Sequence, residues 1–302
     1  MKNVWGIDLG GTKIEGAVLA SAAMPEVLFR DRVPTESAKG YTHMLSQLKK
    51  MVDQMHASLG YLPKKIGIAT PGIRSPKTGL MRNCNTTCLN GMPLKEDLER
   101  LLGIEIAMAN DANCFALAET NMGIVKEKFP EARVVFGVIM GTGVGGGLVV
   151  DGKVINGFHG IGGEWGHNFL DPTYGDRCYC GKVGCVEQIL AGPALQKFYR
   201  QQRGVEKNMK EIHEAYQAGT DEVAKATIER MIHFFGLALS VVVNIVDPDV
   251  IVIGGGVGNI ELLYNEGRKS LEKYIFNDRV FETPMVRPKL GDSAGVFGAA
   301  FL

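Results

Sequence analysis

The first third of the chain alternates short apolar runs with amphipathic stretches, a pattern typical of α/β proteins. The run from Val4 to Leu9 predicts a buried strand, and Gly10-Gly11-Thr12 then turns the chain back into a second strand. Between Gly40 and Leu59, apolar residues spaced three and four apart predict a helix that buries one face. The other elements predicted here are strands at 14–19, 26–33, 66–69 and 104–107, and helices at 94–102 and 112–122.

The opening pattern then returns. A strand at 134–140, the turn Gly141-Thr142-Gly143 and a returning strand at 145–150 repeat the device at the N-terminus. Two copies of one device predict two lobes of related design rather than a solenoid. The stretch 161–185 carries little regular structure. The remaining predictions are helices at 193–203, 209–218, 221–245 and 293–302, and a strand at 250–253 that ends in Gly254-Gly255-Gly256.

These patterns predict a division into two α/β lobes that pack directly against each other. The small lobe comprises residues 1–109, with the C-terminal helix 293–302 returning to it. The large lobe comprises residues 110–292 and contains an irregular loop at 164–187.

Composition and charge narrow the function. The 302 residues carry 33 Lys and Arg against 33 Asp and Glu, and this zero net charge argues against a nucleic-acid-binding protein. No apolar run reaches the ~18 residues of a membrane span, and the N-terminus lacks a signal-peptide pattern, so we expect a cytoplasmic protein without a membrane partner. The 39 glycines are clustered, which indicates backbone that approaches a ligand.

Three glycine clusters follow predicted strands. A strand, a Gly-Thr turn and a returning strand expose backbone N–H groups that form an anion-binding nest. Two such hairpins facing each other across a cleft would hold one triphosphate, and the third cluster would support the nucleotide. The alternative for any one of them is a plain hairpin turn. The candidate nucleotide-binding residues are Gly10, Gly11, Thr12, Gly141, Thr142, Gly143, Gly254, Gly255 and Gly256.

Charged residues flank the first turn. A carboxylate beside phosphate is repelled unless a divalent cation lies between them, so Asp8 is a candidate Mg²⁺ partner through water. Lys13 would neutralise phosphate, and an equally weighted alternative is a solvated strand residue.

Asn110 and Asp111 stand between a predicted strand and a predicted helix. Asp111 could simply cap the helix. The interpretation we favour makes Asp111 the general base for a substrate hydroxyl, because phosphoryl transfer to an alcohol needs a carboxylate to accept the proton. Asn110 would then bind a neighbouring hydroxyl.

A Cys₃His set lies within the loop 164–187. His167, Cys178, Cys180 and Cys185 match the ligands of a closed, structural zinc site, whereas in a reducing cytosol these cysteines are not expected to form disulfides. Zinc would fix the two carboxylates that flank the set, Glu164 and Glu187, and paired carboxylates suit the binding of adjacent sugar hydroxyls.

Taken together, these motifs resemble the ROK family of sugar kinases, within the actin/hexokinase-like superfamily. The resemblance covers essentially the whole chain. Its motifs are Asp8-Leu-Gly-Gly-Thr-Lys13, Ala69-Thr-Pro-Gly72, Asn110-Asp-Ala-Asn113, Gly141-Thr-Gly-Val-Gly-Gly-Gly147, Glu164-Trp-Gly-His167, the Cys178/Cys180/Cys185 run and Gly254-Gly-Gly256. The segments 83–91, 164–168 and 178–182 look most like the fructokinase/mannokinase branch, although that branch often has Trp where this chain has Cys88.

The resemblance implies a two-lobed ATP- and Mg²⁺-dependent hexose kinase that acts on a 6-hydroxyl and forms a homodimer. Fructose or mannose is the expected substrate, and the alternatives are glucose, N-acetylglucosamine and N-acetylmannosamine. Asp111 would be the base, and His167 would contact zinc through one ring nitrogen and the sugar through the other. The implied sugar-binding residues are Gly72, Asn85, Asn110, Glu164, His167 and Glu187.

Two rival functions follow from the same resemblance. A sugar-responsive repressor of this family would carry a DNA-binding helix-turn-helix, for which a first strand at Val4 leaves no room. A sugar-binding protein without activity would be expected to lack Asp111 or one of the glycine turns, and both are present.

Overall fold

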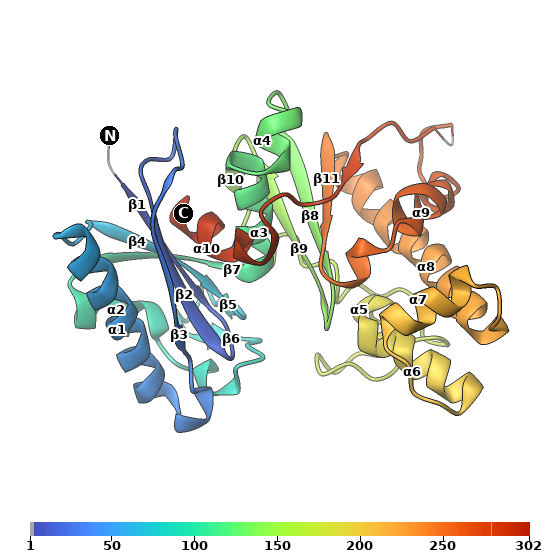
Figure 1. The fold of residues 1–302 in the computed structure, drawn as a ribbon, viewed down its shortest axis with the longest axis horizontal. Helices are drawn as coiled ribbons and strands as arrows, with labels where there is room; N and C mark the ends of the chain where they lie inside the picture. The colour runs from blue at the N-terminus through green and yellow to red at the C-terminus, as the bar shows by residue number, and fades with distance from the viewer. Residues whose placement is uncertain (1–2, 279) are drawn as a thin grey trace. The chain divides into compact units, whose positions relative to one another are not determined.

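The computed structural model describes residues 3–278 and 280–302, and the chain folds into two compact units (Figure 1). The first unit comprises residues 1–133, 147–163 and 289–302, and the second comprises residues 134–146 and 164–288. These units place 110–133 with the N-terminal sheet, whereas the predicted lobes assigned those residues to the large lobe. The lobe boundaries stay a prediction.

The first unit is built on a five-stranded sheet. Its strand order is β3-β2-β1-β4-β7, where the first two pairings are antiparallel and the last two are parallel. The strands are β1 (Val4–Leu9), β2 (Lys13–Leu19), β3 (Val27–Pro34), β4 (Lys65–Thr70) and β7 (Glu105–Asn110). Because β1, β4 and β7 run in parallel, their carboxyl ends bring Asp8, Thr70 and Asn110 to one edge of the sheet.

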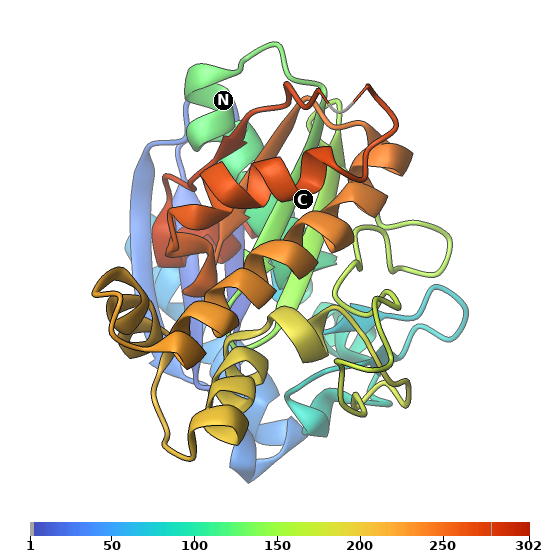
Figure 2. The same ribbon diagram turned by 90° about the vertical axis from the view of Figure 1, so that its right-hand side faces the viewer.

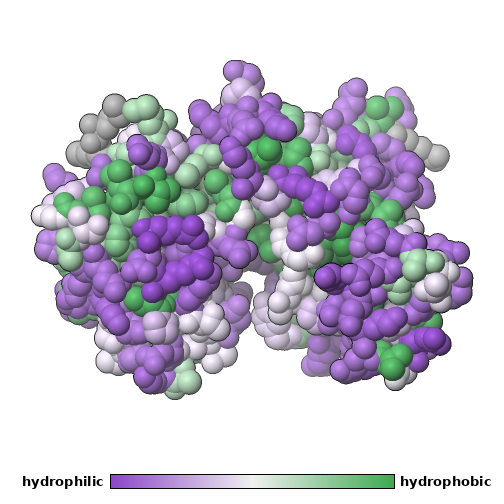
Figure 3. Space-filling view, viewed as in Figure 1, coloured by the Kyte–Doolittle hydropathy of each residue, from purple (hydrophilic) through white to green (hydrophobic). Residues whose placement is uncertain are grey.

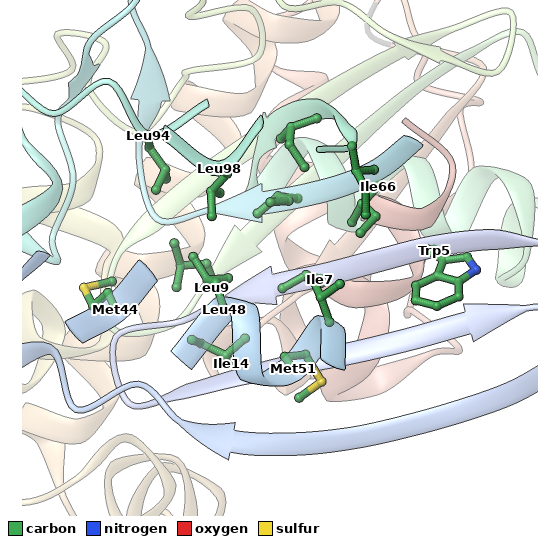
Figure 4. Close-up of a cluster of buried hydrophobic side chains, with 14 of the residues drawn as sticks. Trp5, Ile7, Leu9, Ile14, Met44, Leu48, Met51, Ile66, Leu94 and Leu98 are labelled. Atoms are coloured by element: carbon green, nitrogen blue, oxygen red, sulfur yellow. The ribbon is translucent and has the colours of Figure 1, made fainter. Parts of the chain in front are cut away.

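One face of this sheet is covered by α1 (Tyr41–Leu59) and α2 (Leu94–Leu102). Figure 4 shows Met44, Leu48 and Met51 of α1 against the strand residues Ile7 and Ile14, and all five side chains are buried. The predicted apolar face of the first helix is therefore confirmed.

The C-terminal helix α10 (Ala294–Ala300) packs on β1 and β4. At Gly6 and Gly67 a β-carbon would overlap the carbonyl oxygens of Val296 and Ala299. These two glycines therefore let the C-terminal helix approach the N-terminal sheet closely.

A second five-stranded sheet has the order β10-β9-β8-β11-β12, with β8, β11 and β12 parallel. Counted within each sheet, both have the strand order 3-2-1-4-5, so the predicted duplicated α/β fold is confirmed. The boundary between the two units falls inside β9, after Gly146. The strands are β8 (Val134–Met140), β9 (Val144–Val150), β10 (Lys153–Val154), β11 (Val250–Gly254) and β12 (Met285–Val286).

In the second unit, α8 (Glu222–Val246) packs against α9 (Leu262–Glu272), and Figure 2 shows the two helices side by side. Gly236 permits the close approach, because a β-carbon there would lie 2.5 Å from Ser270 Oγ. Among the described residues, α8 is the one helix long and apolar enough to cross a membrane, but 61% of its most apolar window is buried inside the protein. A helix buried in a protein core can meet the same criteria of length and apolar composition.

The remaining helices are short. Hydrophilic residues predominate over α6 and α7 in Figure 3. Sequence patterns missed the hairpin β5–β6, the helix α4 and the two-residue strands β10 and β12, because segments of two to five residues are too short to show periodicity. The elements not yet given, whether predicted or missed, are β5 (Ile73–Arg74), β6 (Met81–Arg82), α3 (Asp111–Asn121), α4 (Ile124–Lys128), α5 (Glu187–Leu190), α6 (Gly192–Arg203), α7 (Met209–Gln217) and 3₁₀ turns at 37–39, 87–89, 257–259 and 291–293.

Candidate active site

Asn110 and Asp111 lie where β7 ends and α3 begins. The Asn110 side chain caps the helix, because its Oδ1 accepts a hydrogen bond of 2.8 Å from the backbone N–H of Asn113. Asp111 is the first helical residue, and its Oδ1 accepts a 2.8 Å bond from the N–H of Ala112. The structure thus assigns the cap to Asn110, and Asp111 presents its carboxylate at the edge of the sheet.

The Asp111 side chain reaches solvent. The surrounding protein nevertheless limits the hydration of the carboxylate and raises the pKa of Asp111, while the backbone N–H of Ala112 acts in the opposite direction. A raised pKa brings a carboxylate closer to the range in which a general base accepts and releases a proton efficiently.

Asp8, at the end of β1, is the second carboxylate of this edge. Burial, followed by the charges of Asp111 and Glu15, raises the pKa of Asp8 to about 7, although Lys13 acts to lower it. Gly295 leaves room for the carboxylate, because a β-carbon there would lie 2.6 Å from Asp8 Oδ2. A buried carboxylate whose pKa is raised by neighbouring carboxylates suits a cation, so Asp8 fits the predicted Mg²⁺ partner.

Lys13 lies on β2 next to a buried ion cluster. Glu15 is 1% exposed and accepts hydrogen bonds of 2.6 Å from Arg30 Nε and 2.8 Å from Arg32 Nε. Burial acts to raise the pKa of Glu15, but the bonds from Arg32 and Arg30 hold that pKa below its usual value. Lys13 Nζ is 3.6 Å from the same carboxylate, and its side chain is 41% exposed. The predicted contact of Lys13 with phosphate stays a prediction.

The first glycine turn is held by hydroxyl groups. Thr35 donates a 2.7 Å hydrogen bond to the carbonyl of Gly10, and Ser37 donates one of 3.1 Å to the carbonyl of Gly11. The N–H of Gly10 donates to the carbonyl of Lys13 at 3.0 Å. Sequence reasoning missed these two hydroxyl residues, because β3 places them beside the turn only through tertiary pairing.

Gly72 and Asn85 lie near each other after β4. The N–H of Asn85 donates to the carbonyl of Pro71 at 3.4 Å, and a β-carbon at Gly72 would lie 2.5 Å from Cys84 Sγ. The Asn85 side chain is exposed. Cys88, where the fructokinase/mannokinase branch often has Trp, packs against the core of the first unit, with its Sγ 3.1 Å from Met44 Sδ.

The other two glycine clusters meet in the second unit. An ideal β-carbon at Gly141 would lie 3.8 Å from the nitrogen of Gly256, so the turns after β8 and β11 adjoin. Gly255 has a φ of 85°, and a β-carbon on it would overlap the carbonyl of Met140. The adjoining turns bring two glycine-rich stretches of backbone together, as the predicted phosphate nest requires.

The predicted zinc ligands converge in the second unit. The candidate ligand atoms of His167, Cys178, Cys180 and Cys185 all lie within 4.8 Å of one another. His167 Nδ1 is 3.5 Å from Cys178 Sγ, and Cys180 Sγ is 3.5 Å from Cys185 Sγ. Zinc bond lengths in a tetrahedron require ligand separations of roughly 3.5–3.8 Å, so these residues fit the ion.

The segment Glu164-Trp165-Gly166-His167 is fastened to β9. Trp165 Nε1 donates a 2.8 Å bond to the carbonyl of Gly145, and a β-carbon on Gly166 would overlap the carbonyl of Val144. Glu187, the first residue of α5, joins the same strand, because its Oε2 accepts a 3.0 Å bond from the N–H of Val144. The predicted sugar-binding carboxylate Glu187 therefore contacts the backbone directly after the Gly141–Gly143 turn.

Tyr179 is a residue that sequence reasoning missed. Its hydroxyl is 2.8 Å from His167 Nε2, the two rings meet edge to face at 5.0 Å, and the residue is 73% exposed. Burial and then the charges of Glu187 and Glu164 raise the pKa of Tyr179 to about 12. Its position between two predicted metal ligands, Cys178 and Cys180, was the available signal, because a bound zinc ion would fix the backbone on both sides.

The structure gathers the predicted residues into two sets. The set in the first unit is Asp8, Gly10, Gly11, Thr12, Lys13, Gly72, Asn85, Asn110 and Asp111. The set in the second unit is Gly141, Thr142, Gly143, Glu164, His167, Cys178, Cys180, Cys185, Glu187, Gly254, Gly255 and Gly256.

The duplicated α/β fold, with glycine nests and strand-end carboxylates, defines the class of two-lobed α/β kinases. Residues 4–302 match the ROK family, so the chain belongs to that family. It is 37% identical to the N-acetyl-D-glucosamine kinase of Vibrio vulnificus over 311 residues, covering 99% of this chain and 98% of the relative.

Two solved structures extend the comparison. The ROK hexokinase of Thermus thermophilus superposes with a TM-score of 0.87 at 30% identity, over 99% of this chain and 97% of that one. A ROK glucokinase of Streptomyces griseus, in complex with glucose and AMPPNP, superposes with a TM-score of 0.76 at 26% identity, over 99% and 98% of the two chains.

Proposed function

We propose that the protein transfers the γ-phosphoryl group of ATP to the 6-hydroxyl of N-acetyl-D-glucosamine. The chain is an ATP-dependent sugar kinase of the ROK family. The observation that carries the sugar is the 37% identity, over nearly the whole chain, to the Vibrio vulnificus N-acetyl-D-glucosamine kinase. This likeness favours the acetylated alternative over the fructose or mannose expected from sequence motifs.

Asp111 is the proposed base. It accepts the proton of the 6-hydroxyl while that oxygen bonds to the γ-phosphorus, and the bond from phosphorus to the bridging oxygen breaks to leave ADP. Its place at the start of α3 supports this role, because Asn110 already caps the helix and the carboxylate of Asp111 extends from the sheet edge. Bound Mg²⁺ would neutralise phosphate charge, with Asp8 as its partner through water.

The remaining assignments are also proposals. Gly72, Asn85, Asn110, Glu164, His167 and Glu187 bind the sugar. The glycine clusters at 10–12, 141–143 and 254–256 bind the nucleotide with Lys13. His167, Cys178, Cys180 and Cys185 hold a structural zinc ion that fixes the loop carrying Glu164 and Glu187, and the protein forms a homodimer.

A coupled ADP-release assay across N-acetylglucosamine, N-acetylmannosamine, glucose, fructose and mannose tests the proposal. We expect the highest kcat/KM with N-acetylglucosamine, and phosphorus NMR of the product should show a 6-phosphate. A highest kcat/KM with fructose or mannose would overturn the choice of sugar. A protein that phosphorylates none of the five would overturn the proposal as a whole.

A further inference from the structure

We propose that Arg32 contacts the phosphoryl group that the enzyme transfers, as the second cation of a phosphate site that it forms with Lys13 on the buried carboxylate of Glu15. The inference rests on the proposed function, because it concerns the γ-phosphate of the proposed nucleotide. Its starting point is the face of the N-terminal sheet turned away from α1. Ile14 faces α1 (Figure 4), so Lys13 and Glu15, on either side of it in the strand, face away from that helix.

Strand register arranges the charged side chains of this face. Glu15 pairs with Asp8 on β1 and with Arg32 on β3, so these three residues form one row across the sheet. Lys13 lies one pair nearer to the first glycine turn, and Arg30 lies one pair farther from it. Of the three cations around Glu15, Lys13 and Arg32 are therefore the two nearer to the turn.

The two oxygens of Glu15 divide these cations into two groups. Oε1 accepts a 2.6 Å hydrogen bond from Arg30 Nε and one of 3.3 Å from Ser293 Oγ. Oε2 accepts a 2.8 Å bond from Arg32 Nε and lies 3.6 Å from Lys13 Nζ. Because Lys13 and Arg32 share one oxygen of a carboxylate that also serves Arg30, the pair retains positive charge that a phosphate can neutralise.

Arg32 also keeps hydrogen-bond donors for a ligand. Its Nε–H to Glu15 is the one side-chain bond that it makes among the described residues, and its side chain is 44% exposed. The bond to Glu15, and to a smaller degree the charges of Asp292 and Asp8, raise the pKa of Arg32, but neither aspartate forms an ion pair with it in the described part of the chain. The two Nη groups are thus available as a planar fork, which matches the oxygens of a phosphate.

The position of the site indicates which phosphate it would meet. Asp8 and Asp111 belong to one edge of the N-terminal sheet, and the transferred group must approach the hydroxyl that Asp111 is proposed to deprotonate. The γ-phosphate is therefore the group expected beside Asp8, in whose row Arg32 lies. Cationic donors at its nonbridging oxygens would stabilise the charge that they carry during transfer.

The substitution Arg32→Gln tests this contact, because it removes the cation and keeps a polar side chain. Calorimetry with Mg²⁺ compares AMPPNP, which has a γ-phosphate, with ADP, which has none. Loss of a hydrogen bond to a charged group should raise the Kd for AMPPNP about tenfold to a hundredfold and lower kcat/KM for ATP by a similar factor. The Kd for ADP should stay within about twofold of the wild-type value.

Arg30→Gln is the matched control. Arg30 bonds to the same carboxylate and is 41% exposed, but it lies farther from the turn, with its guanidinium over the ring of Phe297 at 5.9 Å. Each variant loses one bond to Glu15, so both should lower the melting temperature by comparable amounts. Only Arg32→Gln should weaken the binding of AMPPNP.

Three results would overturn the proposal. Equal losses of AMPPNP affinity in the two variants would make both arginines supports of Glu15. An equal rise in Kd for AMPPNP and ADP would show that Arg32 does not act on the γ-phosphate, and unchanged constants would place it outside the site. These measurements need no sugar, so a wild type that binds AMPPNP but phosphorylates none of the five sugars contradicts the proposed function alone.

Discussion

Replacing Asp111 with Asn removes the proposed base with little change to the fold. The Asn side chain keeps an oxygen that can accept the N–H of Ala112, which Asp111 Oδ1 does at 2.8 Å. Because Asn110 holds the helix cap, the substitution costs only the charge of an acidic residue in the first turn. That charge stabilises the helix by ~0.3–1 kcal/mol, whereas removal of a poorly hydrated carboxylate favours the folded state. Because the two effects oppose each other, the free energy of unfolding should change by less than about 1 kcal/mol.

Activity should respond very differently. An amide cannot accept the hydroxyl proton, and loss of a general base lowers kcat by about 10²–10⁴-fold, or roughly 3–5 kcal/mol of barrier. The assay is ADP release with saturating ATP and sugar, accompanied by thermal unfolding and by calorimetric binding of ATP. We expect a lost rate, an unchanged melting temperature and intact ATP binding.

Asp31→Asn is the matched control. Asp31 is exposed on β3, and its Oδ1 accepts a 2.8 Å bond from the next backbone N–H, as Asp111 does. Its kcat should equal that of the wild type. If Asp111→Asn also keeps more than about a tenth of the wild-type rate, catalysis does not depend on Asp111 as a base, and its role is confined to the start of α3.

Three further outcomes follow from the structure. Purified protein should hold about one zinc ion per chain, and Cys180→Ser should lower that content in metal analysis and weaken sugar binding; a metal-free active wild type would contradict this. The folded protein raises the pKa of Asp8 to about 7, so the folded state binds this proton more tightly than the unfolded state, and stability falls as pH rises from about 4 to 7. Without divalent metal, Asp8→Asn should therefore raise the melting temperature at pH 8 and leave it unchanged near pH 4. Glu119 is fully buried and accepts bonds from three backbone N–H groups, so Glu119→Gln should lower the free energy of unfolding in urea by more than about 2 kcal/mol, whereas the exposed Glu127→Gln should have little effect.

Sequence patterns predicted the elements whose burial is periodic. The helix from Tyr41 to Leu59 and the strands flanking each glycine turn are confirmed within about two residues, because a buried face imposes its period on the sequence. The candidate zinc ligands were visible from the sequence because the four residues lie close together in the chain. Glu119 carried no such signal, since its three N–H partners come from two segments that meet it only in the fold.

The position of Tyr179 was hidden for a related reason. Spacing predicts that the cysteines on either side are metal ligands, but spacing says nothing of where the intervening side chain points. That direction follows from the turn in which the N–H of Cys178 donates to the carbonyl of Lys182 and the N–H of Gly181 donates to the carbonyl of Cys178. The turn brings the phenol to within 2.8 Å of His167 Nε2, a contact that the spacing of the cysteines alone does not reveal.

Within the second unit, a short chain of contacts connects the predicted zinc site to the glycine turn at 141–143, which we propose binds phosphate. Cys185 precedes Glu187 by two residues, and Glu187 Oε2 accepts the N–H of Val144 directly after the turn. The same oxygen would lie 2.8 Å from a β-carbon at Gly143, so the carboxylate and the turn are packed without spare room. A shift of the metal loop must therefore move the carboxylate or break its bond to Val144. A zinc ion held by these four ligands would therefore act on both proposed substrate sites, although it would leave no position open for chemistry.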